Sequence, residues 1–365
     1  MPLRTLSSPP MRHNRTIATA QIITGIAAAV ALLHFLASII IPFVIAFVLA
    51  VLVNALVRFI QNRWPAAPAW AVSLLAGLVV ILIASTGIFV MAQGVAQIVS
   101  QGPALLARLD TISLQTGRSL HLHEPLHISS VVGTISVADV AKFLLSGMQG
   151  LFSGLLLMVV YFGFMLAGRK RITAKVERAT GSSSRATRIN STIRRIAADV
   201  ETYVWVQTIT GTLLTVSATA VMFGVGLDNV LFWAVIFFLL TFIPNIGVTI
   251  GSVAPSLFAL VQFETLWQAI TIFVVIQVVA TVVGNLIYPR LQAHTQNIDP
   301  VATLLSLAFW SWLWGLPGAF LAVPMTLMSM MVFSQFPSTR WVAAMLSNDG
   351  NPVFRREGET PPDGE

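Results

Sequence analysis

Long runs without a charged side chain dominate the chain, and the charges are gathered into short stretches between them. Each run exceeds the ~20 residues that an α-helix needs to cross the hydrocarbon core of a bilayer. The pattern therefore predicts an all-α protein that crosses a membrane several times. The runs without Asp, Glu, Lys or Arg are residues 17–57, 64–107, 143–168, 202–227, 229–263, 265–289 and 300–339.

Three of these runs are long enough or interrupted enough that the number of membrane spans in each is not fixed by length alone. The first is long enough for two spans, near 17–36 and 38–57, and Pro42 predicts a break between them. The runs at 229–263 and 303–334 are interrupted by proline and glycine. Each of these interrupted runs could form two spans, one kinked span or a re-entrant hairpin.

Composition supports lipid as the main solvent of the chain. Hydrophobic residues make up 56% of the 365 residues and charged residues 10%, with a mean hydropathy of +0.83. A soluble domain has roughly 25% charged residues. There is no cysteine, which excludes disulfides and thiolate-ligated metals. The longest stretches outside the spans, 99–143 and 169–201, leave no soluble catalytic domain, so we do not expect an enzyme.

The distribution of basic residues predicts the topology. Nine Lys and Arg but only one acid lie in 169–195, whereas 99–142 balances three bases with three acids. The positive-inside rule places the basic segment, 168–201, in the cytoplasm and 99–142 outside. The expected organisation is a cytoplasmic tail (1–16), a transmembrane domain (17–339) and a disordered tail (340–365). Residues 169–195 would also attract anionic lipid, and we expect no binding of nucleic acid.

The proline and glycine breaks are the candidate functional site. They free backbone groups that must face protein or a water-filled cavity. In transporters, such half-helices present their positive N-terminal ends to a ligand. The alternative is a simple kink that lets helices pack closely. The candidates in the two broken segments are Pro244, Asn245, Gly247, Gly251, Pro255, Gly315, Pro317, Gly318 and Pro324.

Polar residues inside the apolar runs are the other candidates. Asn245 ranks first as a ligand contact because it lies in a break, and Asn285 follows, one turn before Pro289 and Arg290. None of the 14 acids lies inside an apolar run, so a carboxylate relay at the membrane centre is not expected. Coupling through acids at the edges of runs, through His34 or through backbone carbonyls stays open. The remaining intramembrane polar candidates are Asn54, Gln207 and Gln277.

One stretch imitates a zinc site. Residues 123–127 read HEPLH and match the H-E-x-x-H pattern of zinc peptidases. Pro125 breaks the helix that the pattern requires, and the stretch falls in the predicted external segment. We therefore expect no catalytic metal and no cofactor. An adventitious or regulatory metal site, or a proton sensor, at His121, His123 and His127 is the alternative to a plain external loop.

Three blocks carry a resemblance to a known family. They are IPFVIAFVLAVLVNALVRFIQ, FIPNIGVTIGSVAPSLFAL and GNLIYPRLQAHTQNIDPVATLLSLAFWSWLWGLPGAFLAVPMT. Over roughly residues 17–335 the chain resembles the autoinducer-2 exporter family of bacterial permeases. It departs from the family at Asn54-Ala55, at Asn245 where tyrosine is frequent, at Val248 where proline is frequent, and at Asp299 where histidine is frequent. Three of these four departures fall in or beside the broken segments.

The resemblance implies a multi-pass protein of the bacterial inner membrane, with about eight membrane segments that include broken or re-entrant helices. It implies export of a small polar molecule, autoinducer-2 or a related metabolite. A sodium/proton antiporter and an oligomeric channel or scaffold are the alternatives. It also implies a homo-oligomer, with a pentamer as the assembly.

Overall fold

The structure is a computed structural model whose described residues form helices and no strands. Among these residues, five helices are long and apolar enough to cross a membrane, and several shorter apolar helices accompany them. The predicted class, an all-α protein with several membrane segments, is confirmed. The structure describes residues 12–65, 68–119, 154–165, 168, 175, 176, 178, 179, 181, 183–244, 246–292 and 297–350.

Two apolar helices open the chain. α1 (Arg12–Phe35) and α2 (Ala37–Arg63) are separated at Leu36. The break that we predicted near Pro42 is therefore wrong, since Pro42 lies inside α2. A proline near the start of a helix removes a single hydrogen bond, and here the helix continues through it.

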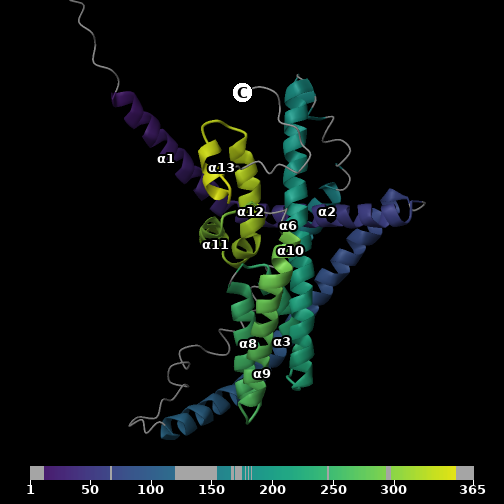
Figure 1. Cartoon of the computed structure of the whole chain (residues 1–365), viewed down its shortest axis with the longest axis vertical. Coiled ribbons are helices and arrows are strands. Elements are labelled where there is room, and N and C mark those ends of the chain that lie inside the picture. Colours follow the sequence, from purple (N-terminus) through teal and green to yellow (C-terminus); the bar gives the residue numbers. More distant parts are fainter. Residues whose placement is uncertain are drawn as a thin grey trace, which may run out of the picture.

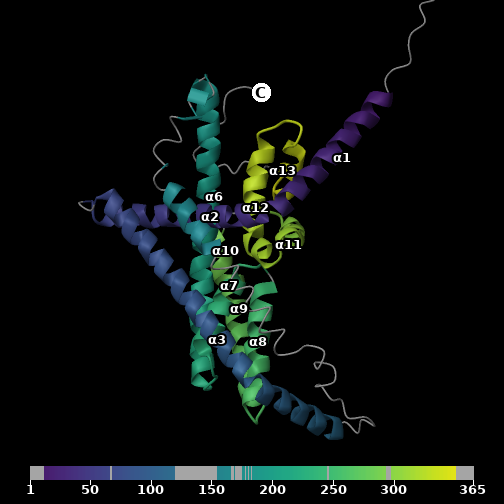
Figure 2. The ribbon, with the colours of Figure 1, turned by 180° about the vertical axis from the view of Figure 1, so that it is seen from behind.

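The third helix is much longer than a membrane span. α3 (Ala69–Ser119) would measure about 77 Å at 1.5 Å per residue, against about 30 Å for the hydrocarbon core. Its apolar part is Trp70–Gln101, so the segment predicted to lie outside begins as a continuation of a helix. Figures 1 and 2 show α3 running obliquely past α6 and α7.

A central bundle occupies the lower part of Figure 1. α6 (Ser183–Gly224) starts in the basic segment and becomes an apolar span. A second span consists of α9 (Trp267–Val282), the π-helix η1 (Val283–Ile287) and α10 (Tyr288–Gln292). Buried side chains of α6 and α9, among them Met222 and Ile272, form one core with the helices between them.

The first broken segment is a helical hairpin. α7 (Val230–Thr241) and α8 (Ile246–Gln262) are about 18 Å and 26 Å long, both shorter than the hydrocarbon core. Gly247 and Gly251 of α8 lie against Leu240 and Phe237 of α7, so the two helices run antiparallel. Of the alternatives left open by the sequence, a single kinked span is excluded here.

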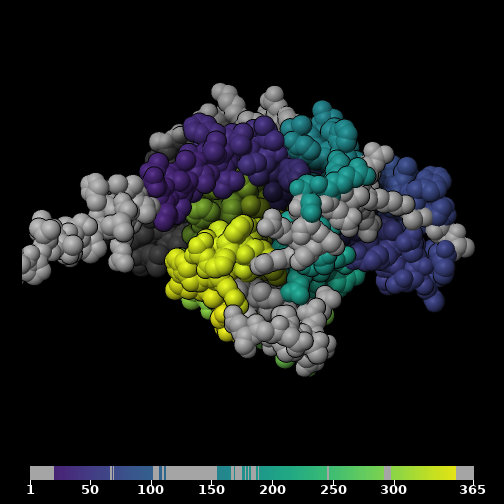
Figure 3. All heavy atoms as spheres, turned by 90° about the horizontal axis from the view of Figure 1, so that it is seen from above, coloured from purple at the N-terminus to yellow at the C-terminus, as the bar shows by residue number. Residues whose placement is uncertain are grey.

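The second broken segment has the same construction. α11 (Pro300–Trp314) and α12 (Leu316–Ser334) meet at Gly315 and pack side by side. Gly318 of α12 lies against the carbonyl of Trp310 of α11. Figure 3, seen from above, shows α11 between purple α1 and the yellow C-terminal segment.

The end of the described chain folds back onto the second hairpin. α13 (Arg340–Leu346) follows α12, and Ala343 is fully buried in a cluster with Tyr203 and Leu327. The Asp299 backbone N–H donates to the carbonyl of Leu346 over 3.1 Å. The prediction of a disordered tail from residue 340 is therefore wrong for residues 340–350. The charged residues and prolines that follow them made the whole C-terminal stretch look disordered. Residues 351–365 lie outside the described part.

Candidate functional site

Both hairpins restart their second helix in the same way. In the first, the Gly247 N–H donates to the carbonyl of Ile243 over 3.0 Å, so Pro244 lies in the turn that leads into α8. In the second, the Ala319 N–H donates to the carbonyl of Gly315 over 3.0 Å, and Pro317 takes the first turn. A proline in a first turn costs no hydrogen bond and fixes a helical φ. We call residues 241–244 the first tip and residues 313–318 the second tip.

Two side chains of α6 hold the carbonyls freed at the first tip. Gln207 Nε2 donates to the carbonyl of Thr241 over 2.6 Å, and the Tyr203 hydroxyl donates to the carbonyl of Phe242 over 3.3 Å. Tyr203, Gln207 and Thr241 are all buried. Because carbonyls at a helix break need partners in an apolar surrounding, these two bonds stabilise the open end of α7.

Glycine allows each hairpin to close. A Cβ at Gly247 would lie 1.6 Å from the carbonyl oxygen of Leu240, and a Cβ at Gly318 would lie 1.8 Å from that of Trp310. Both obstacles are backbone atoms of the facing helix. Gly315 has φ of 64° and ψ of −141°, a conformation that only glycine adopts readily. Three of the predicted residues thus have steric roles that no other residue type can fill.

The two tips contact each other. Ile243 of the first tip is buried in one cluster with Trp310, Leu313 and Trp314. Phe242 stacks on Phe320 of α12, with ring centroids 4.9 Å apart and planes inclined by 29°. The N-terminal ends of α8 and α12, which carry the positive ends of their helix dipoles, therefore lie near this contact between the two hairpins.

The C-terminal end of α1 is fastened to the second tip by two reciprocal bonds. Trp314 Nε1 donates to the carbonyl of Leu33 over 2.9 Å, and His34 Nδ1 lies 3.0 Å from the carbonyl of Leu313. A carbonyl only accepts, so Nδ1 of His34 carries the proton in this contact. The end of α1 thus contacts a tip that lies 279 positions further along the chain.

Removing one of these bonds is expected to loosen α1. Trp314→Phe keeps an aromatic ring and loses the donor to Leu33, so we expect a loss of about 1 kcal/mol in stability. Thermal unfolding of the purified protein in detergent measures the shift. The matched control is Trp312→Phe at a side chain that is 72% exposed. An equal shift in both variants contradicts the assigned bond.

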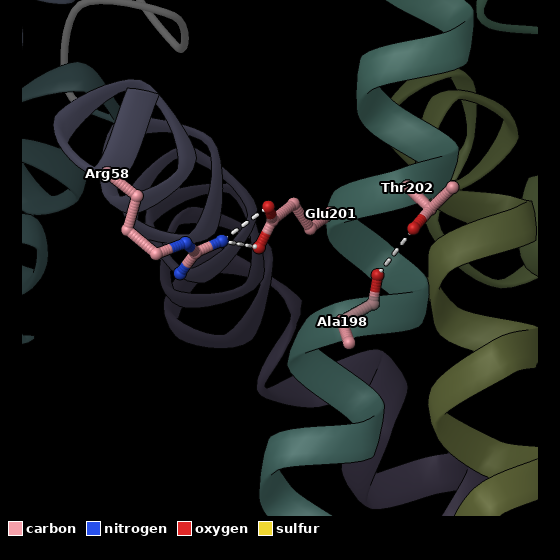
Figure 4. A network of polar contacts seen from close by, with 4 residues as sticks. All are labelled: Arg58, Ala198, Glu201 and Thr202. Carbon is pink, nitrogen blue, oxygen red and sulfur yellow. Dashed lines mark hydrogen bonds and ion pairs between the residues drawn. The ribbon is translucent and has the colours of Figure 1, made fainter. Parts of the chain in front are cut away.

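An ion pair joins α2 to α6 outside the tips. Arg58 Nη2 donates to both carboxylate oxygens of Glu201, as Figure 4 shows. The side chains are 51% and 26% exposed, so the pair contributes about 0–1 kcal/mol. The contact brings the last turns of α2 next to α6.

The predicted site residues fall into two groups. The tips and their hairpins contain Pro244, Gly247, Gly251, Pro255, Gly315, Pro317, Gly318 and Pro324. Asn285, Pro289 and Arg290 lie instead on η1 and α10 with exposed side chains. Asn285 Nδ2 donates to the carbonyl of Thr281 over 2.9 Å. Asn245 lies outside the described residues.

Sequence reasoning missed the residues that hold the tips together. Tyr203, Phe242, Ile243 and Phe320 were not singled out, and Gln207 was named only as an intramembrane polar residue. A tyrosine and a glutamine one turn apart on one helix were the available signal. The HEPLH stretch lies outside the described residues, and the residues that are described contain no group of three or more His, Cys, Asp or Glu able to hold a metal.

Comparison with known proteins gives consistent matches over most of the chain. The model of a family described as "AI-2E family transporter" matches residues 23–338. The putative transport protein YhhT of Escherichia coli is 27% identical over 83% of this chain and 86% of its own length. The AI-2 transport protein TqsA of Escherichia coli is 24% identical over 87% of this chain and 91% of its own length. A putative transport protein of Haemophilus influenzae is 25% identical over 89% of this chain and 95% of its own length.

Proposed function

Since the chain belongs to the AI-2E transporter family, we propose that this membrane protein exports a small polar molecule, autoinducer-2 or a related metabolite, across the bacterial inner membrane. Transport as such follows from the family. The substrate is suggested by the AI-2 transport protein TqsA, one of its relatives. The route that we propose runs through the junction of the two tips.

One observation carries the route: Phe242 and Ile243 of the first tip pack against the second hairpin, close to the start of α12. The nearby N-terminal ends of α8 and α12 attract the oxygen atoms of a polar solute. Phe242, Ile243 and Phe320 place apolar side chains at this contact and hold the two hairpins together in the state seen here. Export then requires the tips to separate, which rearranges the Phe242–Phe320 stack and the contacts of Ile243.

Transport by purified protein tests the proposal. Inside-out membrane vesicles containing the protein should accumulate labelled autoinducer-2, whereas vesicles containing Gly318→Ala should not. A hydroxylated metabolite of similar size that accumulates in its place would keep the route and replace the substrate. Accumulation equal to that of empty vesicles for both solutes, from protein that is folded and inserted, contradicts the proposal.

A second candidate is a sodium/proton antiporter, and His34 favours it. This histidine contacts the second tip, and 17–57 and 300–339 carry no Asp, Glu, Lys or Arg. A proton-coupled mechanism at the second tip would therefore depend on His34. Quenching of a pH-sensitive dye in inside-out vesicles, followed on addition of sodium, distinguishes the two. Our proposal of metabolite export predicts no sodium-dependent change.

A further inference from the structure

The residues just before α11 are hydrogen-bonded to the residues at and after the end of α13. Asn297 is buried, and its Oδ1 accepts from the backbone N–H groups of Asn348 and Asp349 over 3.1 Å and 3.3 Å. Asn297 Nδ2 donates to Oδ1 of Asp349 over 2.6 Å. The Asp299 backbone N–H donates to the carbonyl of Leu346 over 3.1 Å. We call these bonds the C-terminal clasp.

The clasp joins the two ends of the stretch that contains the second hairpin. Between its two sides lie α11, the second tip, α12 and α13. Asp299 also caps α11, because its Oδ1 accepts from the N–H groups of Val301 and Ala302 over 2.8 Å and 3.1 Å. Figures 1 and 2 both show α13 beside α12. The clasp therefore holds α13 at the base of the second hairpin, the end opposite the second tip.

α13 is also packed where the second hairpin meets the helix that supports the first tip. Ala343 is fully buried in a cluster that includes Tyr203 of α6 and Leu327 of α12, and Leu346 packs against the same cluster. The hydroxyl of Tyr203 is the donor to the Phe242 carbonyl in the first tip. One short helix thus adds apolar contacts between the supports of the two tips.

We propose that the C-terminal clasp is a latch that slows the separation of the tips. This inference rests on the proposed function, in which export requires the tips to separate. The second hairpin moves away from α6 only if the contacts of this cluster give way, and α13 adds to them while the clasp keeps it docked. α13 is seven residues long and Asp349 is exposed, so the clasp can open locally while α11 and α12 stay folded.

Thiol chemistry measures the opening of the clasp without any transport, because the chain contains no cysteine of its own. Ser347 is 6% exposed, so Ser347→Cys, which exchanges one atom, should react slowly with a soluble maleimide. Asn297→Asp puts a second carboxylate against Asp349 in place of the donor. Loss of this charge-assisted bond should raise the reaction rate at position 347 about tenfold.

Two controls accompany this variant. Adding Asp349→Asn to Asn297→Asp restores a donor and a carboxylate with their places exchanged, so position 347 should become slow again. Met345→Cys, at a side chain that is 73% exposed, should react at one rate in all three backgrounds. If Asn297→Asp leaves position 347 as slow as before, the clasp does not hold α13 and the proposal is overturned.

The latch itself is tested at the first tip. In protein carrying Pro244→Cys, Asn297→Asp should raise the rate of reaction with a membrane-impermeant thiol reagent severalfold, and the further exchange Asp349→Asn should reverse the increase. The proposal is overturned if the clasp opens, as position 347 reports, while the rate at position 244 stays the same. A wrong substrate leaves these rates unchanged, because no solute is added. A wrong route shows separately, as a position 244 that reacts no faster than the lipid-facing Val216→Cys when the clasp is intact.

Discussion

Gly247→Ala is expected to abolish transport and to lower the stability of the protein. The added Cβ would lie 1.6 Å from the carbonyl oxygen of Leu240, a backbone atom that cannot move aside without displacing α7. Overpacking of this kind costs about 1–3 kcal/mol or more, and the displacement would pull the first tip away from Gln207 and Tyr203. Transport into inside-out vesicles and thermal unfolding in detergent measure the two effects. Gly318→Ala should behave alike in the second hairpin.

The matched control is Gly163→Ala. Gly163 is also a helical glycine, and a Cβ there would meet nothing within 4 Å. Replacing glycine by alanine inside a helix stabilises it by about 0.5–1 kcal/mol, so transport should persist. Full transport by Gly247→Ala would show that the hairpin does not close as described.

Gln207→Leu should be the most damaging substitution of a side chain on α6. It removes the donor to the Thr241 carbonyl, which lies in a buried residue at the broken end of α7. A buried carbonyl without its partner costs about 1–3 kcal/mol, and leucine preserves the volume of the side chain. We expect a lower unfolding temperature together with a reduced transport rate.

Gln262→Leu separates the effect of the first tip from that of a lost glutamine. Gln262 also bonds backbone, donating to the carbonyl of Gly226 over 3.0 Å and accepting from the N–H of Asp228 over 2.8 Å. Those bonds are exposed and lie at the other end of the hairpin from the first tip. If both variants lose transport to the same degree, the assignment of Gln207 to the first tip is incorrect.

The sequence located the breaks but not their partners. Pro244 and Gly315 mark the tips because a proline and a glycine with positive φ act on the backbone around them, and such local effects can be read from one sequence. Tyr203 and Phe320 escaped notice because their contacts depend on which helices pack together. Pro42, in contrast, was wrongly predicted to break a helix, because a proline early in a helix is tolerated.

The same distinction applies to the outer parts of the molecule. Asn285 was predicted as the second candidate ligand contact after Asn245, but the face of a helix that a residue occupies depends on how that helix packs. It lies on η1 with an exposed side chain, and its amide bonds the carbonyl of Thr281 in the preceding turn. The polar composition after Arg340 predicted disorder, yet Ala343 of α13 is buried in a cluster with side chains of α6 and α12. Long-range packing decided both cases.

Access of water to the first tip tests the central claim, that solute passes between the tips. In a chain without cysteine, Pro244→Cys and the lipid-facing control Val216→Cys each introduce a single thiol. The rate of reaction with a membrane-impermeant thiol reagent is measured in intact membranes, from both sides. A route through the tips predicts that position 244 reacts much faster than position 216 and that a transported solute slows the reaction. Equal rates at the two positions, with no effect of solute, would contradict the account.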